Sequence, residues 1–250
     1  MSFEELGEAI INIEYLLENL VRENELSGPD SKVMLEICEK HRMLACGAVL
    51  MDYDVPGFVG HLRKSGEVFL RMHSLKGTYD LDPYYLTASM ASPLFDVVAI
   101  RDFAQAQKIS RVLPRICMSD QGETQEEFLI ARLFSELSEV DPNREETSEL
   151  VYKLESTIDG QESIRFELLI NIGAEKPDPE RFNQDLVALA GEWREKTQKR
   201  RESETIGPYE GSTSAFIFIE GLAYVCLAER AGISIQGEYP GIPDILIRRA

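Results

Sequence analysis

Residues 212–228 read STSAFIFIEGLAYVCLA, a stretch in which Glu220 is the only charged residue. This composition predicts one helix that is apolar on nearly every side. Such a helix has no polar face to turn toward water, so we expect it to lie buried at the centre of a helical bundle. A membrane-spanning helix needs about 20 apolar residues. Since this stretch is shorter and carries a carboxylate in its middle, we expect no membrane partner.

Helix signals also mark most of the remaining chain. Asp82-Pro83, Ser92-Pro93, Asp141-Pro142 and Asp178-Pro179 each place a capping residue before a proline, which is typical of a helix start. Thr124 with Glu127 predicts a capping box. The expected helices cover residues 3–24, 31–51, 56–75, a short segment from 84, a longer one from 93 to about 114, 125–140, 143–157, 164–172, 180–202 and a short C-terminal turn.

These signals predict an all-α fold, a multi-helix bundle of successive helical hairpins with a buried C-terminal helix. No pair of strands is expected, although residues 233–235 fit a short extended segment. The length of 250 residues fits a single helical domain over 1–250, with a soft boundary near 118–123. A helical solenoid is the alternative architecture, for which we find no fixed repeat.

The chain is strongly acidic, with 44 Asp and Glu against 26 Lys and Arg and a net charge of −18. We expect no nucleic-acid partner, because phosphates would be repelled. A basic protein partner would be attracted, although acidity also serves solubility alone. The N-terminal residues are acidic and amphipathic, unlike a targeting segment. Cys38, Cys46, Cys117 and Cys226 have no disulfide-framework spacing, so a cytoplasmic protein with reduced thiols is expected.

No recognisable catalytic or cofactor-binding motif is present, so we expect a non-enzymatic protein without a cofactor. Cys38 and His41 lie one helical turn apart with Cys46 nearby, but a zinc site needs more converging ligands, and no metal site is expected. A helical enzyme with a site around His61, His73 and Glu220 is the weaker alternative. For Glu220 itself, the simpler interpretation is a buried carboxylate paired with an arginine or a backbone amide.

Half of the excess negative charge falls within residues 119–159, which hold twelve acidic residues and three basic ones, a net of −9. The periodicity of the two helices there places the apolar residues inward and leaves a charged face outward. The residues predicted to bind a cationic partner through this face are Glu136, Glu139, Glu145, Glu146 and Glu149. A simply solvated face is the alternative.

The C-terminal part resembles a known family. The residues that carry the resemblance are FIEGLA (218–223), LAERAGI (227–233), YPGIP (239–243) and LI (246–247), with LACGAVL (44–50) similar in character. This ending resembles the immunity protein 49 family of bacterial polymorphic toxin systems. A helical immunity family that antagonises PoNe-type DNases has a similar helix and Tyr-Pro ending.

The resemblance implies an α-helical cytoplasmic immunity protein that binds and neutralises a cognate toxin domain by covering its active site or substrate approach. A basic nuclease is one toxin class that the acidic face would suit. A helical-repeat scaffold for endogenous proteins is the alternative function.

Overall fold

The computed structural model describes residues 2–157 and 163–248. The α-helices of these residues are α1 (Phe3–Leu26), α2 (Ser31–Asp52), α3 (Val55–Ser74), α4 (Ser92–Ala99), α5 (Phe103–Val112), α6 (Gln125–Leu137), α7 (Arg144–Thr157), α8 (Ile164–Gly173), α9 (Pro179–Glu202), α10 (Pro208–Ser212), α11 (Ile219–Arg230) and α12 (Asp244–Ile247). Four short 3-10 helices, η1 (Pro83–Leu86), η2 (Ala88–Met90), η3 (Ser119–Gln121) and η4 (Ser214–Phe216), lie between them. No β-strand forms in the described residues, and the all-α prediction is confirmed.

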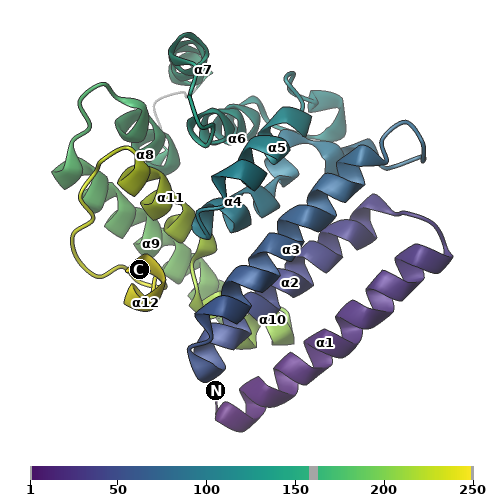
Figure 1. The fold of residues 1–250 in the computed structure, drawn as a ribbon. Helices are drawn as coiled ribbons and strands as arrows, with labels where there is room; N and C mark the ends of the chain where they lie inside the picture. The colour runs from purple at the N-terminus through teal and green to yellow at the C-terminus, as the bar shows by residue number, and fades with distance from the viewer. Residues whose placement is uncertain (1, 158–162, 249–250) are drawn as a thin grey trace.

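α1, α2 and α3 form the N-terminal part of the structure and lie side by side (Figure 1). Each begins at a residue whose side chain accepts a hydrogen bond from the first turn: Ser2 from Glu5 N–H, Asp30 from Val33 N–H, and Asp54 from Gly57 N–H. Tyr53, with a left-handed φ of 53°, ends α2 directly before Asp54. The chain therefore reverses within two residues, and α3 returns along α2.

The helix predicted from Pro93 to about Pro114 is instead two helices, α4 and α5, separated at residues 100–102. Arg101 adopts a left-handed φ of 61° and donates hydrogen bonds to Glu229 Oε2 at 2.7 Å and to the Ile247 carbonyl at 2.8 Å. Asp102 caps α5 at the Gln105 N–H. Contacts with the distant C-terminal part thus stabilise a break that the local sequence does not mark.

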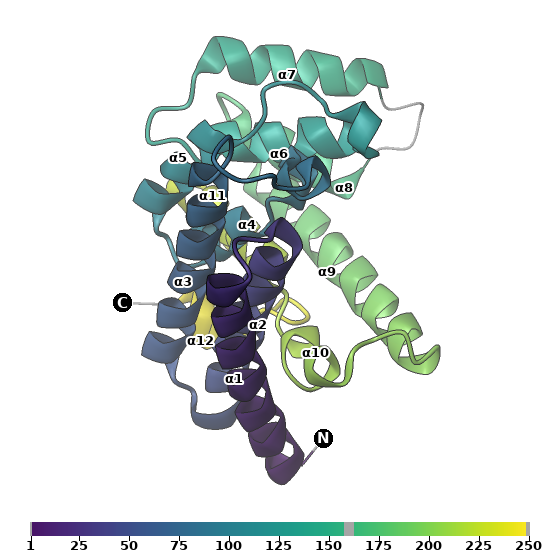
Figure 2. The ribbon, with the colours of Figure 1, turned by 90° about the vertical axis from the view of Figure 1, so that its right-hand side faces the viewer.

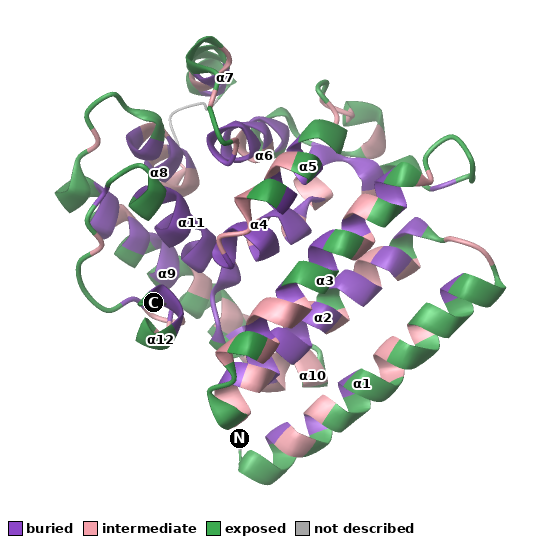
Figure 3. Ribbon diagram, in the orientation of Figure 1, coloured by how far each residue is buried: buried purple, intermediate pink, exposed green. Residues whose placement is uncertain are grey.

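The helix predicted over 212–228 is also interrupted. α10 ends at Ser212, η4 follows, and the continuous helix α11 begins only at Ile219. The Phe218 N–H donates to the Gly241 carbonyl at 2.7 Å, so this N–H bonds to the C-terminal loop and not to a preceding helical turn. The prediction of a buried C-terminal helix is confirmed for α11, in which every residue from Gly221 to Ala228 is buried (Figure 3).

One connected hydrophobic cluster extends from Met34 of α2 to Ile247 of α12, and α11 lies within it. A smaller cluster of Ile13, Met43 and Leu44 holds α1 against α2. α1 and α7 lie on the outside, at different ends of the molecule (Figures 1 and 2). Among the helices described, none is both long and apolar enough to span a bilayer. Residues 233–235 form no strand.

Candidate functional site

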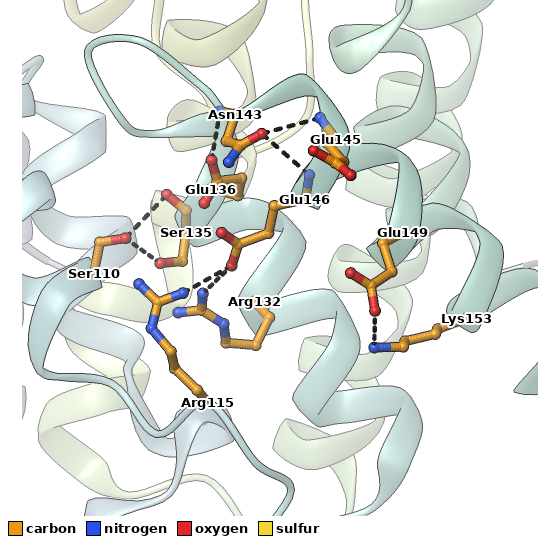
Figure 4. Close-up of polar contacts among 10 residues, drawn as sticks. All are labelled: Ser110, Arg115, Arg132, Ser135, Glu136, Asn143, Glu145, Glu146, Glu149 and Lys153. Carbon is orange, nitrogen blue, oxygen red and sulfur yellow. Dashed lines mark hydrogen bonds and ion pairs between the residues drawn. The ribbon is translucent and has the colours of Figure 1, made fainter.

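The acidic segment folds as a hairpin of α6 and α7, shown in Figure 4. Thr124 and Glu127 form the predicted capping box at the start of α6, which fixes where this helix begins. At the start of α7, Asn143 Oδ1 accepts hydrogen bonds from the N–H groups of Glu145 at 3.0 Å and Glu146 at 3.3 Å. Asn143 is therefore the capping residue of α7, and the predicted Asp141-Pro142 start lies in the loop before it.

Glu136 is not available to a partner, contrary to the predicted outward orientation. Its side chain is 6 % exposed, and Oε1 accepts a hydrogen bond from the Asn143 N–H at 2.6 Å. Burial raises the pKa of Glu136, while the Asn143 N–H opposes this shift. Arg132, one turn earlier on α6, is only 3 % exposed. The reason is that α7 packs over this side of α6, so the polar face of α6 lies inside the hairpin.

Glu146 takes part in an internal ion-pair cluster. Its Oε1 accepts from Arg115 Nη1 and from Arg132 Nη2, both at 2.9 Å (Figure 4). Glu145 and Glu149 are exposed, and Glu149 pairs with Lys153 one turn later at 2.6 Å. The outward acidic face of the hairpin is therefore smaller than predicted.

Glu139 lies half-buried in the connection after α6. Its backbone carbonyl accepts a hydrogen bond from Arg230 Nη2, and the neighbouring Ser138 carbonyl accepts from Arg230 Nη1 at 3.0 Å. The Arg230 guanidinium also lies over the Phe103 ring, 4.4 Å from its centroid. The end of α11 thus holds the hairpin connection to the bundle.

Glu220 lies in the first turn of α11, where a carboxylate is favoured by the helix dipole. Both of its oxygens accept from Arg165 of α8, Nε to Oε1 at 2.5 Å and Nη2 to Oε2 at 3.0 Å. Hydrogen bonding to Glu220 raises the pKa of Arg165 above its ordinary value. The Glu220 side chain is 21 % exposed, so it is half-buried rather than buried. With Arg165 and Lys196 it lines a cleft of about 350 Å³ that contains neither His61 nor His73.

The histidines lie in two separate places. His41 Nδ1 lies 3.2 Å from His61 Nδ1, a pairing of α2 with α3 that the sequence did not suggest. Burial, with His61 nearby, lowers the pKa of His41 to about 4. His73 packs against Phe69 with ring centroids 4.6 Å apart, and burial lowers its pKa to about 4. The imidazoles of His41 and His73 are therefore neutral near pH 7.

The cysteines of α2 are buried within the bundle. Cys38 Sγ donates to the Ser65 carbonyl at 3.3 Å, and burial raises the pKa of Cys46 to about 12. A metal-binding thiol must be deprotonated, which this environment opposes. Within residues 2–157 and 163–248, no three His, Cys, Asp or Glu side chains converge as metal ligands.

The sequence analysis missed a second acidic surface, the outward side of α1. We call this the α1 face: residues Glu4, Glu8, Ile11, Tyr15, Glu18 and Arg22, spaced at alternating steps of four and three, all of them exposed. Ile11 and Tyr15 are 65 % and 66 % exposed. The helix holds seven Glu, all exposed, and a single basic residue, Arg22. The same periodicity that predicts its buried side would have found this face.

No protein-family model matches the chain, and no curated protein or solved structure is significantly similar to it.

Proposed function

We propose that this chain is an immunity protein that binds a cognate toxin domain and covers its active site or substrate approach. The resemblance of residues 218–247 to the immunity protein 49 family supports this role. The net charge of −18 supports a partner with a basic surface, such as the substrate groove of a nuclease. Glu136 and Glu146 form hydrogen bonds within the protein. We therefore expect the partner to bind a surface other than the α6–α7 hairpin.

The α1 face carries the proposal, because it combines features of a protein interface. Protein interfaces place aromatic and aliphatic side chains at the centre and polar groups at the rim. Tyr15 and Ile11 lie exposed at the middle of α1, with Glu8 and Glu18 one turn to either side. α1 packs inward on α2 and α10 and leaves this side unpaired.

The two components of the face would act at different steps of binding. Carboxylates attract a basic partner over a distance of about 10 Å at ordinary ionic strength and so raise the association rate. A desolvated aromatic side chain mainly slows dissociation. Charge reversal on α1 is therefore expected to change association, and truncation of Tyr15 to change dissociation.

The test is co-expression with the toxin domain encoded beside this gene, scored by host survival, followed by binding kinetics on the purified complex. We expect the unaltered chain to rescue growth. The double variant Glu8→Lys/Glu18→Lys should reduce the association rate constant at least about tenfold at low salt. Tyr15→Ala should raise the dissociation rate constant with little change in association.

Two matched controls separate local from global charge. Glu175→Lys/Glu238→Lys changes the net charge equally at exposed positions outside α1 and α7. Glu145→Lys/Glu149→Lys tests the hairpin with the same charge change. If the α1 variants bind as the Glu175/Glu238 control does, the α1 face is not the interface. If the unaltered chain neither rescues growth nor forms a complex, the immunity role is wrong.

A further inference from the structure

A cleft of about 610 Å³ lies between α6, α7 and the segment that joins α5 to η3. Its apolar lining comes from Phe128 and Leu129 of α6 and Leu150 of α7. Arg115 and Arg132 line the same cleft. Most of the other lining residues are polar or charged, among them Asn143 and Lys153, so the cleft is mainly polar around this pair of guanidinium groups.

The two arginines of the cleft share a hydrogen-bond acceptor. Arg115 and Arg132 share a single acceptor, Glu146 Oε1, at 2.9 Å each, and the two guanidinium groups lie side by side beneath it in Figure 4. The two guanidinium groups thus share one carboxylate oxygen as their hydrogen-bond acceptor. A second anion beside this pair would be attracted by the two guanidinium groups and repelled by Glu146.

Arg132 also has an unused donor. Its side chain is only 3 % exposed, and Nη1 has no hydrogen-bond partner in the described structure. A buried donor of a charged group that is left unpaired is costly, so such groups normally have an acceptor. The described residues supply no acceptor to Nη1, and an acceptor atom of a ligand would complete this part of the site.

We propose that the cleft binds a carboxylate group beside the two arginines. This carboxylate accepts hydrogen bonds from Arg132 Nη1 and from Arg115. The planar fork of a guanidinium matches the two oxygens of a carboxylate. A phosphate would also fit the fork, but Glu145 and Glu149 line the same cleft and repel a dianion more than a monoanion. The carboxylate belongs either to a free small molecule or to an Asp side chain of a polypeptide. The site does not depend on the immunity role.

The experiment follows the side-chain Nε–Hε signals of Arg115 and Arg132 by NMR while sodium acetate is added at constant ionic strength. We expect saturable shifts with acetate and none with sodium chloride. Acetyl-Gly-Asp-Gly-amide is the polypeptide probe. If this peptide binds at least tenfold more tightly than acetate, the natural ligand is a polypeptide. If the two bind equally, the natural ligand is a small carboxylate. Tighter binding of inorganic phosphate than of acetate overturns the assignment.

Three variants test the charge argument. Arg115→Gln, at a side chain that is 65 % exposed, should weaken acetate binding at least fivefold without loss of folding. Glu146→Gln should tighten it severalfold, because the competing carboxylate is removed. Arg144→Gln removes the same charge from the exposed start of α7, outside the cleft lining, and should leave binding unchanged. Absence of a saturable shift in the unaltered protein, or equal acetate affinity in all four proteins, would overturn the proposal.

Discussion

Arg42 of α2 and Asp96 of α4 form an ion pair, Nε to Oδ1 at 2.7 Å, in which the Asp96 side chain is completely buried. Ser65 of α3 donates to the other oxygen of Asp96 at 2.6 Å. One carboxylate therefore links three helices that contribute to the main hydrophobic cluster. A buried carboxylate is tolerated only when its oxygens are paired in this way.

Asp96→Asn keeps the shape of the side chain but removes its charge, so Arg42 loses its counter-ion beneath the surface. We expect the free energy of unfolding to fall by about 3 kcal/mol. The measurement is urea denaturation followed by circular dichroism. Asp80→Asn, at an exposed loop position, is the control and should change stability by less than about 0.5 kcal/mol. Equal effects of the two substitutions would show that the Arg42–Asp96 pair adds little to the free energy of unfolding.

His73 predicts a specific pH dependence. Burial, with Lys76 adding to it, lowers its pKa from an ordinary 6.5 to about 4 in the folded state. Between these values the unfolded chain binds the proton more tightly, so stability is complete above about pH 6.5 and is lost as the pH falls toward 4. The contribution lost between pH 7 and pH 5 is about 2 kcal/mol.

His73→Leu removes this titration. Since His73 Nε2 has no hydrogen-bond partner in the described residues, an apolar side chain leaves no acceptor or donor there unpaired. Urea denaturation of the variant at pH 7 and pH 5 should show a smaller loss of stability on acidification than in the unaltered chain. Identical losses in both proteins would mean that His73 protonates as readily in the folded state as in the unfolded one.

Helix starts were predictable where the capping interaction is local. Asp82, Thr124 and Asp178 each bond to a backbone N–H two or three residues later, as their sequence context indicates. The predictions that Ser92 and Asp141 cap helices were wrong. Ser92 already lies inside α4, and Asn143 caps α7. A proline with a preceding capping residue marks the neighbourhood of a start but not which residue makes the bond.

The orientation of the acidic residues was less predictable, because it depends on which helix covers which face. Periodicity identifies Leu129 and Leu133 as buried, and they are. It cannot show that α7 folds back over Arg132 and Glu136 and buries the opposite side of α6 as well. The break at Arg101 has the same origin, since its partners are more than 120 residues away in the chain.

The Arg165–Glu220 pair is expected to couple α8 to α11 modestly. Arg165 is 41 % exposed, so solvent screens much of the attraction. A double-mutant cycle of Arg165→Ala and Glu220→Ala should give a coupling energy of about 1 kcal/mol, helped by the bidentate geometry. The measurement is urea denaturation of the four proteins at low salt and at 1 M NaCl. A coupling that does not fall at high salt would contradict an electrostatic origin.

Two glycines in helices should respond in opposite directions to the same substitution. A Cβ added at Gly221 of α11 would lie 2.3 Å from Phe218 Cδ1 and 2.8 Å from Ile242 Cδ1. Phe218 cannot move aside freely, because it is 2 % exposed and stacks on Trp193 with centroids 5.1 Å apart. Gly221→Ala should therefore destabilise the protein by about 1–3 kcal/mol through overpacking.

A Cβ at Gly191 of α9 would meet no atom within 4 Å, and the position is exposed. Gly191→Ala should therefore stabilise the protein by about 0.5–1 kcal/mol, because alanine loses less backbone freedom in a helix than glycine does. Thermal and urea denaturation of both variants measure the two effects. Opposite signs would establish that Gly221 is required by the close approach of Phe218 and the C-terminal loop to α11. A stabilising Gly221→Ala would show instead that this contact relaxes at no cost.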